Sequence, residues 1–248
     1  MLAILSPAKR IRPCPCPYGL APTRPVFQEE AAELGELLRG YSPWQLESLL
    51  GVSPELALDA FALCQGFDAA APGSPALLAY QGLAYWNLDP GGFSREDLLA
   101  AQERLRILSA LYGVLRPLDG ISPHRLDFLA RLRPEGKTLY RWWGEKICRE
   151  LFSAGEPVVN LCSGEYARAA APWLGPGDVF LTVRFLQRRG GRLVTRPTAA
   201  KAARGQMARW LVLERLTRPE ELTAFSWEGY RFSPGLSHSL EYVFLQED

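Results

Sequence analysis

Short apolar runs at both ends and in the middle of the chain constrain its fold most strongly. They occupy residues 2–5 (LAIL), 158–162 (VVNLC), 178–186 (DVFLTVRFL) and 241–245 (EYVFL) of a 248-residue sequence. Each is of strand length and rich in residues that favour strands. We expect one central sheet of mixed strand direction, assembled from distant segments. Residues 230–233 (YRFS) should add a strand, and Gly190-Gly191 should turn a hairpin toward residues 192–196.

Helical patterns fill the intervals between these strands. Ser-Pro pairs at 42–43 and 53–54 combine an N-cap with proline at the first helical position. We predict helices over the ranges 26–40, 42–50, 53–64, 94–113, 139–154 and 199–216. Strands and helices do not alternate regularly, so the pattern indicates a mixed α/β (α+β) fold rather than a doubly wound one. We expect residues 1–248 to form a single domain, with a helix-hairpin-helix-like insertion at 41–67.

Positive charge is concentrated near the end of the chain, although the formal net charge is only +1. No acidic residue lies between Asp178 and Glu214, an interval with eight basic residues. Such a block creates a local positive potential. It could face a nucleic-acid backbone, a small anion in a pocket, or water.

Three polar stretches could carry chemistry. SPAKR at 6–10 and the NLCSGEY stretch at 160–166 follow buried strands, where ligands often bind at the rim of a sheet. KAARG at 201–205 places Lys201 and Arg204 on one helix face. Gly205 inside that helix indicates close packing or a ligand near the backbone, because glycine costs roughly 1 kcal/mol there relative to alanine.

Other classes of protein are disfavoured. No apolar run approaches the roughly 18 residues of a membrane span, and the N-terminal residues do not resemble a secretory signal, so we expect a cytoplasmic protein with no membrane partner. Five cysteines suit a reducing compartment. Cys14 and Cys16 lack the spacing of a redox or zinc pair, and known cofactor-binding motifs are missing, so we expect neither metal nor cofactor.

Several of these motifs occur together in a known family. SPAK at 6–9, LRILSALYGVLRPLDGISPHRLDF at 105–128, LYRWWG at 139–144, NLCSGEY at 160–166, KAARGQMARW at 201–210 and LTAFSWEGYRF at 222–232 run in order along the chain. The sequence resembles the YaaA family of bacterial peroxide-stress proteins. The resemblance implies a single-domain α/β fold with a helix-hairpin-helix element and a positively charged cleft. It also implies duplex-DNA binding and resistance to hydrogen peroxide through limiting free iron.

Three functional hypotheses follow. The first is sequence-independent binding of duplex DNA, with phosphate or anion contacts from Ser6, Lys9, Arg10, Arg188, Arg189, Arg192, Lys201 and Arg204. The second is an enzyme for a small phosphorylated or carboxylated metabolite, in which Lys201 and Arg204 hold the anion, Glu165 is a general base, and Ser6 and Ser163 orient the substrate. Its catalytic residues would be Ser163, Glu165 and Lys201. The third is an iron- or peroxide-reactive protein in which Cys14 or Cys16 is the sensor.

Overall fold

A nine-stranded mixed sheet forms the centre of the molecule. The computed structural model describes residues 1–71 and 73–247. Along the sheet the strands lie in the order β11-β12-β13-β9-β8-β1-β5-β6, and β10 pairs with β9. Their bounds are β1 Leu2–Leu5, β5 Leu105–Ser109, β6 Gly113–Leu115, β8 Val158–Asn160, β9 Phe180–Arg189, β10 Arg192–Val194, β11 Ser226–Trp227, β12 Tyr230–Phe232 and β13 Glu241–Gln246. The predicted α/β fold is confirmed, including the hairpin at Gly190-Gly191.

The strand directions define a reversal point in this sheet. β1 pairs in parallel with β5 on one side and with β8 on the other, and the series β8, β9 and β13 continues in parallel. The chain therefore visits β5 beside β1 and then crosses to β8 on the opposite side of β1. The carboxyl ends of β1 and β8 meet where the order of the strands reverses. Open α/β sheets bind ligands at such points.

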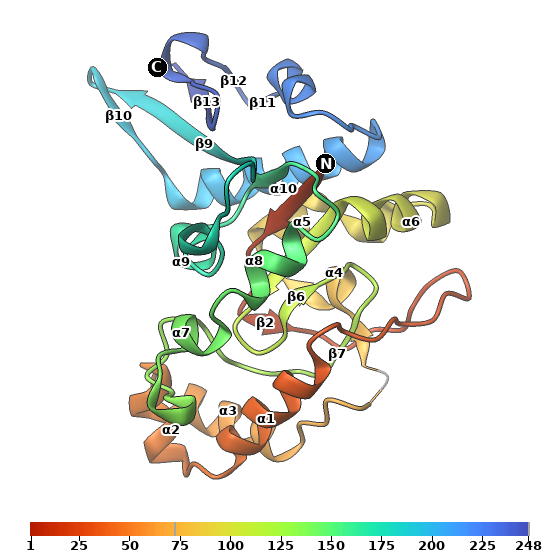
Figure 1. Ribbon diagram of the computed structural model, residues 1–248, viewed down its shortest axis with the longest axis vertical. Coiled ribbons are helices and arrows are strands. Elements are labelled where there is room, and N and C mark those ends of the chain that lie inside the picture. The colour runs from red at the N-terminus through yellow and green to blue at the C-terminus, as the bar shows by residue number, and fades with distance from the viewer. Residues whose placement is uncertain (72, 248) are drawn as a thin grey trace.

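Helices surround the sheet and extend it at one end (Figure 1). Their bounds are α1 Gln28–Arg39, α2 Pro43–Leu50, α3 Pro54–Gln65, α4 Ala76–Ala79, α5 Leu83–Leu88, α6 Arg95–Arg104, α7 Leu139–Trp143, α8 Lys146–Leu151, α9 Gly164–Ala167 and α10 Pro197–Leu213. α1, α2 and α3 gather at the end of the molecule opposite β10–β13 (Figure 1). Two short pairs, β2 (Arg10–Ile11) with β4 (Tyr80–Gln81) and β3 (Ser74–Pro75) with β7 (Gly120–Ile121), complete the fold.

Three of the predicted helix starts, at Ser42, Ser53 and Ser94, are confirmed by their caps. The Ser42 side chain accepts a hydrogen bond from the Gln45 amide, and Ser53 accepts one from Leu56. Ser94 and Asp97 form a reciprocal capping box at the start of α6. These side chains satisfy amide groups that the first helical turn leaves without partners.

The predicted helix over 94–113 is wrong in its second half. α6 ends at Arg104, and residues 105–109 form β5, which lies between β1 and β6. Apolar residues at Leu105, Leu108 and Tyr112 fit a helical spacing. However, β5 is almost entirely buried, and a strand buried on both faces loses the alternation that distinguishes it from a helix.

The predicted helix over 139–154 is also wrong, because it is two helices. α7 ends at Trp143; the next residue, Gly144, has φ 53° and ψ −132°, and α8 begins at Lys146. The backbone of Gly144 adopts a conformation that side chains other than glycine rarely tolerate. The break lets α7 and α8 follow different directions, and Trp143 is fully buried at the junction.

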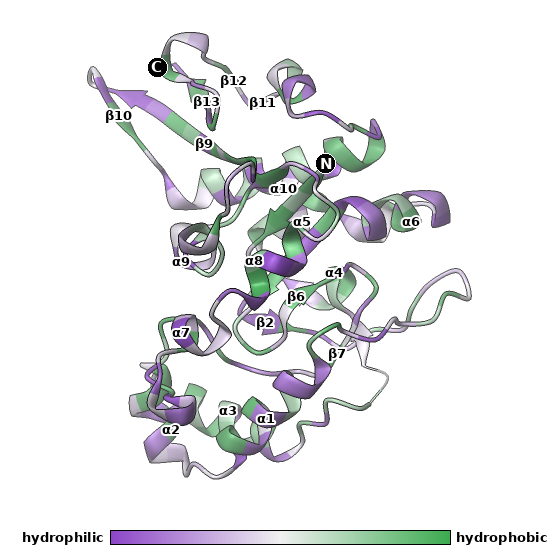
Figure 2. Cartoon of the chain, viewed as in Figure 1, coloured by the Kyte–Doolittle hydropathy of each residue, from purple (hydrophilic) through white to green (hydrophobic). Residues whose placement is uncertain are grey.

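The hydrophobic core is centred on the parallel strands. β1 is hydrophobic along its length, whereas β9 changes from hydrophobic near the core to hydrophilic toward the hairpin (Figure 2). One cluster of buried side chains runs from β1 through α1, α6 and α10. These buried side chains thus form one continuous core, as expected for the single domain predicted from the sequence.

Candidate functional site

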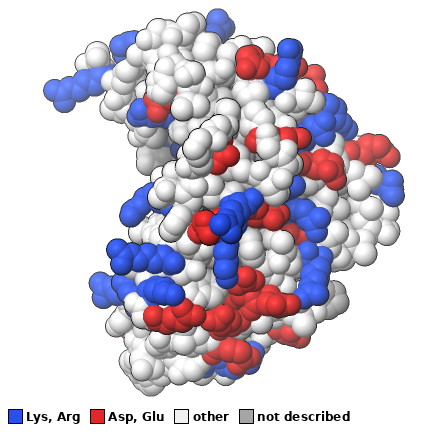
Figure 3. Space-filling model, viewed as in Figure 1, with Lys and Arg blue, Asp and Glu red and all other residues white. Residues whose placement is uncertain are grey.

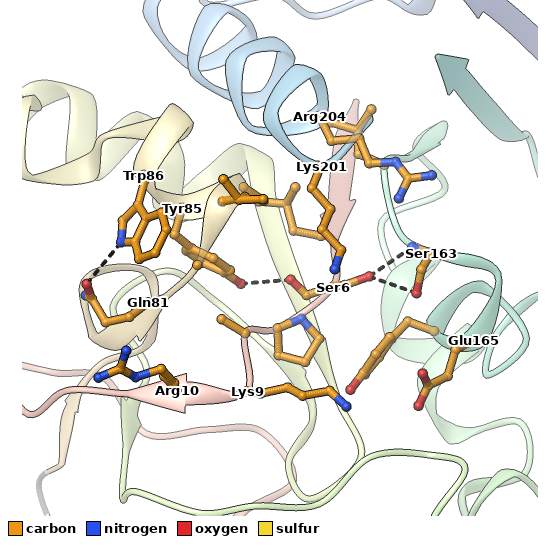
Figure 4. Close-up of a pocket in the computed structure, with 18 of the residues that line it drawn as sticks. Ser6, Lys9, Arg10, Gln81, Tyr85, Trp86, Ser163, Glu165, Lys201 and Arg204 are labelled. Carbon is orange, nitrogen blue, oxygen red and sulfur yellow. Dashed lines mark hydrogen bonds between the residues drawn. The ribbon is translucent and has the colours of Figure 1, made fainter. Parts of the chain in front are cut away.

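A pocket of about 420 Å³ opens at the carboxyl ends of β1 and β8. Its walls come from the segment after β1, from β4 and α5, from the segment after β8, and from α10. Seven residues predicted from the sequence line it together: Ser6, Lys9, Arg10, Ser163, Glu165, Lys201 and Arg204. The three polar stretches therefore converge on one site (Figure 4).

Two serines fix the floor of the pocket between β1 and β8. Because Ile4 pairs with Asn160 in parallel register, Ser6 and Ser163 leave the sheet side by side. The Ser163 amide donates to Ser6 Oγ at 2.9 Å, and the Ser6 hydroxyl lies 3.4 Å from Ser163 Oγ. The Tyr85 hydroxyl donates to the Ser6 carbonyl at 3.0 Å. These bonds hold the Ser6 and Ser163 side chains at the point of strand reversal.

α10 supplies two cations from one face. Lys201 points toward Ser6, and the guanidinium of Arg204 points toward the segment that carries Ser163 (Figure 4). No hydrogen bond or ion pair joins either side chain to any residue that the structure describes, and Arg204 Nε is enclosed. Burial lowers the pKa of Arg204 from its usual value, but an arginine keeps its charge in proteins. Two unpaired cations therefore face the pocket.

Gly205 brings α10 close to α5. A Cβ atom at this position would lie 2.0 Å from the carbonyl oxygen of Ala84. Glycine is therefore required by close packing, one of the two explanations that the sequence allowed. The contact holds α10 close to α5, so that Lys201 and Arg204 on α10 line the same pocket as the residues of α5.

A carboxylate lies on the opposite side of the pocket from α5. Burial raises the pKa of Glu165, and the negative charge of Asp127 raises it further. The amides of Phe128 and Leu129 and the ammonium of Lys9 act in the opposite direction. Glu165 Oε1 is buried without a hydrogen-bond partner among the described residues. This carboxyl group is therefore poised to accept a proton or a hydrogen bond from a ligand.

Asp127 also belongs to the site, and the sequence analysis missed it. Its carboxylate lies 3.2 Å from Lys9 Nζ and accepts a hydrogen bond from the Tyr166 hydroxyl at 3.0 Å. It belongs to the stretch 105–128 that carries the family resemblance, but it lies in a loop without regular pattern, so the sequence did not place it at the pocket.

The wall formed by β4 and α5 was missed as well. Gln81, Tyr85 and Trp86 line the pocket, and Trp86 is 59% exposed. Arg10 pairs with Gln81 across β2 and β4, which places both side chains near Trp86 (Figure 4). The aromatic residues within 76–88, including Tyr85 and Trp86, were the signal that the sequence offered.

The arginines of the β9–β10 hairpin do not line this pocket. Arg188, Arg189 and Arg192 lie at the end of β9 and the start of β10, in a hairpin that projects from the sheet (Figure 1). Arg188 pairs with Glu247 at 2.7 Å, and Arg184 pairs with Glu241 at 3.3 Å. The predicted phosphate contacts therefore occupy two places in the fold: Arg188, Arg189 and Arg192 lie on the hairpin, and Lys201 and Arg204 line the pocket.

The helical pair predicted at 41–67 is present as α2 and α3. Gly51 adopts φ 63° in the connection, and Glu55 and Asp59 are exposed on α3. Exposed carboxylates beside this turn would repel a phosphate backbone.

The cysteines and possible metal ligands offer little reactive chemistry. Burial raises the pKa of Cys14 and of Cys16, which reduces the thiolate that reacts with peroxide. Within residues 1–71 and 73–247, no group of three or more His, Cys, Asp and Glu side chains is arranged to hold a metal ion. In the same residues, no helix is both long and apolar enough to cross a membrane.

The balance of charge in the pocket favours an anion. Four cationic side chains (Lys9, Arg10, Lys201 and Arg204) face two carboxylates (Asp127 and Glu165). Lys9 is already paired with Asp127. Among the described residues, the lining cations without an ion-pair partner are Arg10 on β2 and Lys201 and Arg204 on α10, and the lining carboxylate without one is Glu165.

Comparison with known proteins agrees with the motifs. A family model described as "Peroxide stress protein YaaA" matches residues 1–236. The chain is 40% identical to a UPF0246 protein of Limosilactobacillus fermentum over 248 residues, covering all of both chains. It is 38% identical to a UPF0246 protein of Laribacter hongkongensis, again over the full length of both, and 36% identical to one of Lacticaseibacillus paracasei over 99% of each. The chain belongs to the family of the peroxide stress protein YaaA.

Proposed function

We propose that the pocket at the ends of β1 and β8 binds a small metabolite that carries a phosphate or carboxylate group. The observation that carries this proposal is the pair of unpaired cations, Lys201 and Arg204, with Arg204 Nε enclosed beside the pocket. A buried polar group without a partner costs about 1–3 kcal/mol, so its presence in a cavity calls for a ligand. Arginine binds phosphate and carboxylate in a bidentate manner, and lysine adds a point charge.

The other pocket residues suit chemistry on such a ligand. Ser6 and Ser163 would orient the anion through their hydroxyl groups, and Glu165 would act as a general base. A carboxylate with a raised pKa is a stronger base than an ordinary one, which favours proton abstraction near neutral pH. Apolar walls from Leu5, Pro7 and Leu161 would reduce the competition from water.

Isothermal titration calorimetry with a panel of phosphorylated and carboxylated metabolites tests the proposal. A ligand should bind the wild type, and Lys201→Ala should weaken binding by about tenfold or more, the usual cost of a charged hydrogen bond. Arg204→Lys keeps the positive charge but removes the planar guanidinium group that binds an anion in a bidentate manner, so it should also weaken binding. Arg192→Ala, on the hairpin outside the pocket, is the matched control and should bind normally. Equal affinity in all four proteins would refute an anion site on α10.

Duplex DNA is a second candidate ligand, favoured by the surface charge. Lys and Arg side chains extend from the hairpin region and, lower on the same side of the molecule, near α9 and α7 (Figure 3). Arg141 is exposed on α7, and Arg168, the residue that follows α9, is exposed as well. Such a surface would contact phosphates without reading sequence, and DNA binding in a peroxide-stress protein would serve to limit iron-dependent damage.

Fluorescence anisotropy with a labelled duplex across a salt series separates the two candidates. Binding to a phosphate backbone weakens linearly in log affinity with log salt concentration. If the surface binds DNA, the double variant Arg141→Glu/Arg168→Glu should lose binding while Lys201→Ala retains most of it. Absence of binding by the wild type at low salt would eliminate DNA as a partner and leave the pocket proposal intact.

A further inference from the structure

An exposed tryptophan forms one wall of the anion pocket. Trp86 is 59% exposed although it lines a pocket with apolar walls. Trp86, Gln81 and Arg10 lie on one side of the pocket, Ser163 and Glu165 lie on the other, and Lys201 lies between them (Figure 4). A large aromatic face left open beside a cluster of cations is a surface on which a planar ligand can stack.

The ring of Trp86 is held in place by Gln81. Trp86 Nε1 donates to Gln81 Oε1 at 3.4 Å, and Gln81 Nε2 donates to the Leu78 carbonyl at 3.2 Å. Both ends of the Gln81 amide therefore already have partners within the protein. Gln81 thus supports the indole, and it keeps a second N–H and a second carbonyl lone pair that can contact the edge of a ligand.

The lining of the pocket combines three kinds of surface. Trp86 offers an aromatic face on one side, with Arg10 beside it; Pro7, Ala8 and Leu83 are apolar; and Lys201 and Arg204 are the cations that α10 supplies. A mononucleotide combines three matching parts: a planar base, a neutral sugar and a charged phosphate. Its size suits a cavity of about 420 Å³. An inorganic anion or a simple polycarboxylate would leave Trp86 uncovered.

We infer that the ligand of this pocket is a nucleoside monophosphate, with its base stacked on Trp86 and its phosphate held by Lys201 and Arg204. The inference rests on the proposed function and names the class of its anionic ligand. Trp86 recognises the base through stacking on its ring face. Purine nucleotides, which present the larger ring face, bind more tightly than pyrimidine nucleotides.

Calorimetry with AMP, CMP, ribose 5-phosphate and adenosine on the full-length protein tests the inference. AMP should bind at least tenfold more tightly than ribose 5-phosphate or adenosine, and more tightly than CMP. Trp86→Ala should weaken AMP about 10- to 100-fold, the range of base–aromatic stacking, without changing ribose 5-phosphate. Trp86→Phe should restore most of the affinity. Trp44→Ala is the control, because Trp44 is 78% exposed on α2 and outside the pocket.

The possible failures are distinguishable. Equal affinity for AMP and ribose 5-phosphate, with no effect of Trp86→Ala, would overturn the nucleotide inference and leave the anion pocket standing. No binding of any phosphate compound would overturn the inference and remove the phosphate form of the proposed function. A DNA duplex could instead bind more tightly than AMP, with Trp86→Ala weakening both to the same extent. That result would overturn the inference of a free mononucleotide and identify the ligand as a nucleotide within a polymer.

Discussion

Replacing Gly205 by alanine tests how the cationic face of α10 is positioned. In an isolated helix the change would stabilise by roughly 1 kcal/mol, because glycine is the poorer helix former. Here the new methyl group would lie 2.0 Å from the Ala84 carbonyl oxygen, whereas ordinary contact begins at 3.4 Å. The neighbour is backbone, so it cannot rotate away. The backbones of α10 and α5 would have to separate by more than an ångström.

The expected result is a net loss of stability. Overpacking a closely packed contact costs about 1–3 kcal/mol, and a backbone clash belongs at the upper end of that range. Subtracting the helix-propensity gain leaves a loss of about 2 kcal/mol, or about 4–8 °C in Tm for a chain of this size. The displacement of α10 would also move Lys201 and Arg204, so anion affinity should fall with stability.

Differential scanning calorimetry on Gly205→Ala and a matched glycine variant measures the effect. Gly235→Ala is the control, because a Cβ atom there would meet nothing within 4 Å and the backbone is not in the left-handed region. The control should leave Tm unchanged. An unchanged or raised Tm in Gly205→Ala would refute the view that close packing against α5 selects glycine.

Three further variants test other contacts of the site. Ser6→Ala leaves the Ser163 amide without its acceptor and should cost about 1–3 kcal/mol in urea unfolding, whereas Ser48→Ala on the exposed face of α2 should be nearly neutral. Glu165→Gln should raise Tm at neutral pH, because the folded-state pKa of Glu165 is raised. The contribution of Glu165 to stability is present below the unfolded pKa of about 4.3 and is lost as pH rises through the folded pKa. The difference in Tm should therefore close in acid, and a constant difference would contradict this assignment. Asp127→Asn should strengthen binding of the anionic ligand by about fivefold in calorimetry, because it removes a negative charge from the pocket and releases Lys9. Weaker binding would argue for a structural role of the Lys9–Asp127 pair.

The sequence predicted the sheet and the main site residues for a physical reason. Strand-length apolar runs followed at once by polar residues identify the carboxyl ends of buried strands, as at Ser6 and Ser163. Parallel pairing of β1 with β8 then brings those ends together. Lys201 and Arg204 were recognisable because helix geometry places residues three apart on one face.

Other features depended on tertiary contacts that no local pattern encodes. Residues 105–109 fit both a helix and a buried strand, and the position between β1 and β6 decides for the strand. Asp127 and Trp86 reach the pocket from a loop and a short helix whose placement follows from packing of the whole domain. Their residue types were visible in the sequence, but their proximity to Ser6 and Lys201 was not.

The basic interval between Asp178 and Glu214 illustrates the same distinction for charge. Along the sequence its eight cations form one block, but in the fold they divide into two groups. β13 lies parallel to β9, so Glu241 and Glu247 pair with Arg184 and Arg188 from a segment more than fifty residues away. On α10, Lys201 and Arg204 have no acidic neighbour of this kind among the described residues. Local charge density in the sequence therefore does not show which cations have acidic partners. Lys201 and Arg204, which have none among the described residues, are also the two of these cations that line the pocket.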